Sequence, residues 1–168
     1  MSDLQRVTTL FVPAEDRIRL AGEVAGGDAR VLWLTRRLAD RLVPVLVGWL
    51  EEQVAARDVW QGEVMQAFAQ QAASAALVPQ VPVSGESATA SWLVSEVDVV
   101  RGEQRLDLRF KGAAGEQVSL ALVPQALRQW LGILHAAYRQ ADWPVVVWPQ
   151  WLREAGEPVA ARSPGVMH

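Results

Sequence analysis

The chain has 168 residues, of which 51% are hydrophobic and 21% are charged, a composition that excludes extensive disorder and allows one compact domain or two small halves. It contains no cysteine and two histidines, which excludes disulfides, thiolate metal sites and cysteine nucleophiles and disfavours a histidine-rich metal site. The net charge of -3 disfavours a protein that coats nucleic-acid backbones.

The longest strongly apolar segment without a charge is Leu42 to Leu50, between Arg41 and Glu51. A segment of this length is too short for a bilayer, which needs about 20 residues. The N-terminus lacks the pattern of a secretory signal. All of the basic residues except Lys111 are arginines, which is typical of a GC-rich bacterial genome. We therefore expect a cytoplasmic bacterial protein without a membrane span.

The first half of the chain predicts three strands and then a helix, at residues 7–12, 17–24, 29–34 and 36–57. Thr35 can cap this helix, and Pro44 is expected to kink or break it near Leu42. A second helix is predicted over 62–77, with an apolar stripe formed by Val64, Met65, Phe68, Ala72 and Ala76.

Prolines, serines and a glycine then mark residues 78–91 as a linker. The second half repeats the earlier order, with predicted strands and a helix at 92–100, 104–111, 117–123 and 124–141. Residues 145–148 are predicted to be extended, and residues 149–154 to form one more turn. The expected organisation is a first unit over 1–77, the linker, a second unit over 92–154 and a tail over 155–168.

An internal repeat supports this organisation, because residues 15–50 align with residues 103–138 at a constant offset of 88 with eight identities. Convergent patterning of two similar units is the alternative. The predicted fold class is α+β, with duplicated βββα units forming one continuous antiparallel sheet of six strands with both helices on one face. Two three-stranded sheets packed through their helices are the other arrangement considered.

Arginines suggest two sites for an acidic group, since a guanidinium binds carboxylate or phosphate in a bidentate manner. Arg17 and Arg19 lie on the polar face of one predicted strand, and the repeat places Arg105 and Arg109 on the equivalent strand. In one continuous sheet these four side chains would share a surface, with a solvated face of cross-strand ion pairs as the alternative.

The second basic group opens the first long helix, where Arg36 and Arg37 precede Asp40 and Arg41. Positive side chains oppose the helix dipole at this end, so we expect an acidic partner to favour them there. Pairing with Asp40, or simple exposure, is the alternative.

Tryptophan is unusually abundant, with eight residues in the chain. Strand alternation places Trp33 on the face opposite Leu32 and Leu34, beside Arg17 and Arg19. Tryptophan and arginine are enriched at interface hot spots, so these residues are predicted to bind a protein partner. A second set of candidates is interleaved with prolines near the C-terminus and either binds a partner or folds back over the core: Trp143, Trp148 and Trp151.

Catalytic patterns are missing from the sequence, and neither a cofactor nor a metal is expected. His135 lies on the predicted polar stripe of its helix, and we expect it to be exposed. The sequence favours a non-catalytic bacterial binding protein, such as an adaptor, an assembly factor or a small subunit of a complex, with a homo-oligomer left open. The alternative is a small-molecule-binding protein or enzyme that holds an anionic ligand between the two halves through Arg105 or Arg109.

Overall fold

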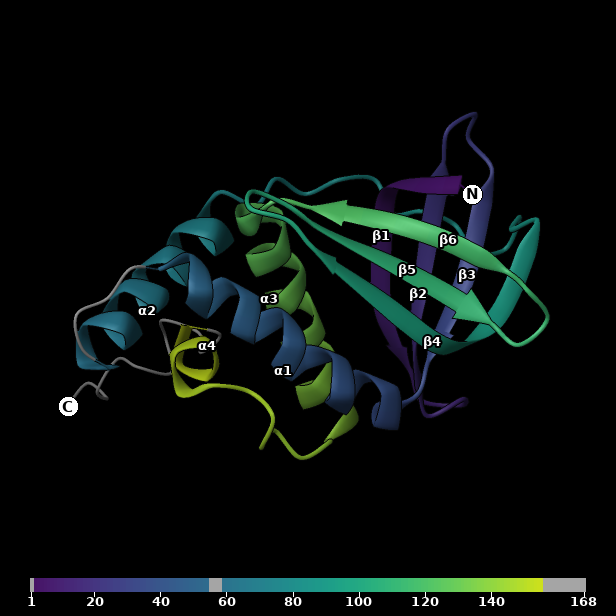
Figure 1. The fold of residues 1–168 in the computed structure, drawn as a ribbon. Coiled ribbons are helices and arrows are strands. Elements are labelled where there is room, and N and C mark those ends of the chain that lie inside the picture. The colour runs from purple at the N-terminus through teal and green to yellow at the C-terminus, as the bar shows by residue number, and fades with distance from the viewer. Residues whose placement is uncertain (1, 55–58, 156–168) are drawn as a thin grey trace.

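A computed structural model describes residues 2–54 and 59–155 of the chain. Six strands and four helices follow one another as β1 (Ser2–Val12), β2 (Arg17–Val24), β3 (Ala29–Leu34), α1 (Arg36–Gln53), α2 (Val59–Ala75), β4 (Ala90–Arg101), β5 (Leu106–Gly112), β6 (Gln117–Leu122), α3 (Pro124–Ala141) and α4 (Gln150–Ala155). Figure 1 shows the strands on one side of the molecule and the helices on the other.

The strands form a closed barrel in the order β1-β2-β3-β4-β5-β6. Strands within each half are antiparallel, whereas the two halves meet through parallel pairs, β3 with β4 and β1 with β6. The prediction of one open antiparallel sheet packed by helices is therefore wrong. Closure satisfies the backbone N–H and C=O groups of β1 and β3 that an isolated three-stranded unit leaves unpaired.

The two halves are related by the offset of 88 in their structure as well as in their sequence. Strands β3 and β6 and helices α1 and α3 begin and end at positions that differ by this offset. The parallel pairs also match, because Ser2 opposite Val118 corresponds to Ala90 opposite Arg30. Only the first hairpins differ in register, with turns over 13–16 and 102–105.

The turns between β2 and β3 and between β5 and β6 each contain a glycine with a positive φ. Gly27 has φ of 92° and its counterpart Gly115 has φ of 91°. A side chain at either position would strain the backbone, since L residues rarely adopt this conformation. The two identical glycines of the sequence repeat thus occupy equivalent left-handed positions.

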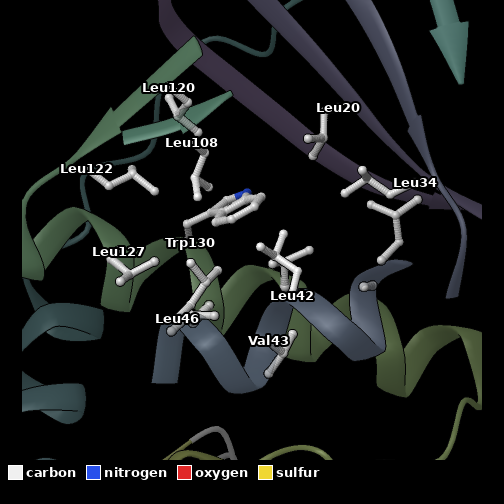
Figure 2. Packing of buried hydrophobic residues seen from close by; sticks show 14 of the residues in the cluster. Leu20, Leu34, Leu42, Val43, Leu46, Leu108, Leu120, Leu122, Leu127 and Trp130 are labelled. Atoms are coloured by element: carbon white, nitrogen blue, oxygen red, sulfur yellow. The ribbon is translucent and has the colours of Figure 1, made fainter. Parts of the chain in front are cut away.

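Leucines fill the space between the barrel and the helices. Figure 2 shows Leu20 and Leu34 of the first half facing Leu108, Leu120 and Leu122 of the second. Trp130 from α3 and Leu42 and Leu46 from α1 enter the same cluster, all of them buried. The region between the two halves, where a ligand pocket was the alternative prediction, is thus occupied by packed side chains.

Local predictions differ from the structure at the connections. Helix α1 is continuous through Pro44, whose ring lies on the exposed side, so the expected break is absent. Residues 145–147 form no strand, and the chain turns there before α4. The predicted tail lies outside the described residues apart from Ala155, and the predicted end of α1 at 55–57 lies outside them too.

The core position of Leu46 can be tested by truncation. Leu46 has 0% exposure in the centre of the leucine cluster, and Leu46→Ala should therefore lower the free energy of unfolding by about 2–5 kcal/mol. Arg37→Ala on the exposed side of the same helix should change it by less than about 0.5 kcal/mol. Urea denaturation measures both values, and equal losses would contradict the described core.

The left-handed glycines allow a second test with a matched control. Gly27→Ala and Gly115→Ala should each cost about 1–2 kcal/mol, because the added methyl group meets no atom but forces an unfavourable φ. Gly48→Ala adds a methyl group in equally open space inside α1 and should stabilise the protein by about 0.5–1 kcal/mol. Thermal unfolding of the three variants gives the signs, and a stabilised Gly27→Ala would overturn the assignment of the turn.

Candidate functional site

The arginines predicted to share one sheet surface are separated by barrel closure. Arg17 and Arg19 lie on β2, whereas Arg109 lies on β5 and Arg105 immediately precedes it. Two strands separate β2 from β5 in either direction around the barrel, so their outer faces point away from each other. The predicted four-arginine surface is therefore not formed.

Cross-strand ion pairs occupy the outer face of the second half instead. Lys111 of β5 contacts two carboxylates of β4, Asp98 at 2.6 Å and Glu96 at 3.5 Å. The hydrogen bond from Lys111 holds the pKa of the Asp98 carboxyl below its usual range. Arg105 pairs with Asp107 at 3.1 Å, which agrees with the alternative interpretation of this face as a solvated charged surface.

Trp33 points away from the barrel interior, as strand alternation predicts, but the linker partly covers it. Its indole Nε1 donates a hydrogen bond of 3.2 Å to the Ser91 hydroxyl oxygen. Trp33 packs beside a small apolar cluster on the outer face of β2 and β3, which includes Val83 of the linker. Gly85 of the linker lies close to the guanidinium of the neighbouring Arg19, so the linker covers part of this predicted site.

The three C-terminal tryptophans are buried, so this segment folds back over the core. Trp143 donates its Nε1 hydrogen bond to Asp16 at 3.2 Å and stands edge-on to Tyr138. Trp148 makes similar edge contacts with Tyr138 and with His135. Trp151 stacks beneath the guanidinium of Arg128 at 5.5 Å. These tryptophans contribute packing area rather than an accessible surface.

The basic group at the start of α1 remains at the surface. Arg36 forms an ion pair of 3.4 Å with Asp40, whose carboxylate also accepts a hydrogen bond from Tyr138. Arg37 and Arg41 are exposed and form no hydrogen bond or ion pair with another side chain of the described residues. All four α1 residues line an open hollow of about 480 Å³, so a cationic surface lies at the N-terminus of this helix.

Helix α2 is oriented with its polar face inward. Gln66 and Gln70 are buried, and Gln66 donates to the backbone oxygen of Leu50 while Gln70 donates to that of Arg128. The guanidinium of Arg128 in turn donates to Gln66 Oε1 at 2.6 Å. Hydrogen bonds between glutamines and the neighbouring helices therefore hold α2 in place.

The apolar side of α2 consequently faces solvent. Trp60, Met65 and Phe68 are 72%, 47% and 68% exposed, and Ala72 is exposed on the same side. Leu77, Val78 and Val81 continue the exposed apolar residues after the helix ends. We call these seven residues the α2 apolar surface. Figure 1 shows α2 as the helix farthest from the barrel.

The predicted apolar stripe of α2 lies on the exposed side of the helix, and Trp60 on the same side was not among the predicted site residues. The available signal was charge, because no charged residue occurs between Val64 and Gly85. The solvent-exposed face of a surface helix ordinarily carries charged side chains. That uncharged segment could have marked the surface before the structure was known.

Two polar residues of α3, Arg128 and His135, are buried, contrary to the prediction that His135 is exposed. His135 has 4% exposure, and its burial, together with the charges of Arg139 and Arg153, lowers its pKa to about 4. Burial also lowers the pKa of Arg128 to about 10. Both groups therefore belong to the interior of the helical side of the molecule.

The depressed pKa of His135 makes stability depend on pH. Because the folded-state pKa of about 4 lies below the unfolded value of 6.5, the unfolded chain takes up the proton first as the pH falls. The free energy of unfolding should thus fall by up to about 3 kcal/mol between pH 6.5 and pH 4, with no contribution from His135 above that window.

His135→Gln removes this titration and should give a flatter profile over the same pH range, whatever its stability at pH 7. Urea denaturation of both proteins at several pH values measures the difference in slope. Parallel profiles would show that His135 is not buried in its neutral form.

Comparisons with known proteins and searches of the described residues supply no further candidate site. Among residues 2–54 and 59–155, no helix is both long enough and apolar enough to cross a membrane. The same residues contain no group of three or more histidine or carboxylate side chains placed to hold a metal ion. No protein-family model matches the chain, and neither a curated protein nor a solved structure matches it significantly.

Proposed function

We propose that this chain is a non-catalytic bacterial binding protein that acts as an adaptor, an assembly factor or a small subunit of a complex, and that it holds its protein partner through the α2 apolar surface. The observation that carries the proposal is the exposure of Trp60, Met65 and Phe68 on a helix whose polar face is buried. The cytoplasmic location expected from the sequence is part of this proposal and stays a prediction.

The size of the surface supports binding. With about 150–250 Å² for a whole side chain of these types, the three large residues of α2 expose roughly 400 Å², and Leu77, Val78 and Val81 raise the total to roughly 700 Å². The largest apolar patch of a typical monomer measures about 300–600 Å², and larger ones mark interaction sites. The aromatic residues Trp60 and Phe68 are of the kind that dominate binding energy at interfaces.

The cationic surface of Arg36, Arg37 and Arg41 supports an additional electrostatic contribution. Arg37 and Arg41 form no ion pair within the described part of the chain, so their charge is free to attract an acidic partner. Such exposed charges increase the association rate more than the affinity. We therefore propose that the α2 apolar surface provides the affinity for the partner, and that the arginines at the start of α1 increase the rate of association.

Partner capture by purified variants tests the proposal. Trp60→Ala and Phe68→Ala should each reduce recovery of the partner by tenfold or more from a lysate of the source organism, the effect of losing about 2 kcal/mol of binding energy. Both side chains are largely exposed, so the melting temperature should change little. Val146→Ala is the matched control, because Val146 is 86% exposed but lies between α3 and α4.

The proposal would be overturned if Trp60→Ala and Phe68→Ala retained full capture at unchanged stability. A salt titration separates the two surfaces. Capture that depends on Arg37 and Arg41 should weaken with salt, whereas capture that depends on Phe68 should not.

A further inference from the structure

The exposed face of α2 has its large aromatic side chains at the N-terminal end and in the middle, and alanines at the C-terminal end. Trp60, Val64, Phe68 and Ala72 follow one another at intervals of four residues, which places them on one side of the helix. Ala75 is exposed on the same side, one turn beyond Ala72. The face is therefore bulky at its N-terminal end, aromatic in the middle and flat at its C-terminal end.

From this distribution of side-chain sizes, and resting on the proposed function, we infer that the α2 apolar surface is covered by a second copy of this chain. The two α2 helices run antiparallel, with Phe68 of each copy beside the two-fold axis. This arrangement places the bulky Trp60 of one copy over Ala75 and Ala76 of its partner, and Val64 over Ala72. A parallel arrangement would instead oppose the two tryptophans and leave a gap between the alanines, and gaps in an interface lose contact energy.

The distribution of charge fits a symmetric partner. A two-fold interface brings the same patch of both copies together, so a charge near the axis would face its own equivalent. Glu63 is the only charged residue of α2, and no other charge occurs before Glu86. Glu63 lies more than one helical turn from Phe68, toward the end of the contact. The apolar residues around the axis are therefore compatible with their own copies.

The area is sufficient for a specific dimer. Burial of the roughly 700 Å² exposed on each copy would remove about 1,400 Å² from solvent, and stable specific interfaces bury about 1,200–2,000 Å². Leu77 and Val78 follow the flat end of α2 and would extend the contact toward Trp60 of the partner. The exposed face of α2 and the apolar residues that follow the helix together provide an interface of ordinary size.

Sedimentation velocity of the full chain tests directly whether it forms a dimer. At a concentration of about 100 μM, the chain of 18.4 kDa should sediment as a dimer of about 37 kDa. Phe68→Asp should yield a monomer that is still folded by circular dichroism, because it places two carboxylates beside the axis. Val146→Asp introduces the same charge at another highly exposed apolar position and should remain a dimer.

Cysteine crosslinking tests the direction of the helices, and the chain provides a background free of cysteine. Phe68→Cys should form a disulfide with its own copy on oxidation. Val64 and Ala72 each lie one turn from Phe68 on opposite sides. A mixture of Val64→Cys and Ala72→Cys chains should therefore crosslink to each other in preference to crosslinking with themselves.

The outcomes separate this inference from the proposed function. If the chain is a monomer that captures another protein in a Phe68-dependent way, the inferred dimer is wrong and the proposed function stands. A monomer without Phe68-dependent capture would overturn both. A dimer in which Val64→Cys crosslinks mainly with itself would overturn the antiparallel arrangement.

Discussion

The two parallel strand pairs that join the halves determine the rest of this structure. Strands β3 and β4 pair from Arg30 opposite Ala90 to Trp33 opposite Leu93, and β1 and β6 pair at the other junction. Without these pairs each half would have two open edges and would expose the inner leucines of its sheet. Closure buries the inner faces of both halves at once, and α1 and α3 complete the core with residues such as Leu46 and Trp130.

Parallel pairing also explains the long connection between β3 and β4 in which α2 lies. Adjacent parallel strands cannot be joined by a tight turn and need a long crossover connection. The chain between β3 and β4 contains α1, α2 and the linker, and this crossover carries the elements that have no counterpart in the repeat. The duplicated part of the chain thus builds the barrel with α1 and α3, whereas α2 and the linker, which have no counterpart, provide the α2 apolar surface.

Local features of this fold could be predicted from the sequence because they depend on neighbouring residues. Alternation placed Trp33 outside and Leu32 inside correctly, and the repeat located Gly27 and Gly115 in equivalent turns. Barrel closure could not be predicted in this way, since side-chain periodicity contains no information about which edges pair. The assignment of Arg17 and Arg109 to one surface failed for that reason. The exposure of the α2 apolar surface was missed because periodicity groups residues on a face without showing which face is buried.

The orientation of α2 follows from the polar residues on its neighbours. Arg128 of α3 is buried, and Gln66 Oε1 provides its hydrogen bond while Trp151 packs against its guanidinium. If α2 turned its apolar face inward, Arg128 and the carbonyl oxygen of Leu50 would lose their partners, and a buried cation without partners is strongly destabilising. The glutamines therefore lock the helix with Trp60 and Phe68 outward. Specific buried hydrogen bonds therefore keep the apolar side of α2 exposed to solvent. This is why we propose that binding occurs there rather than at the arginines of the barrel.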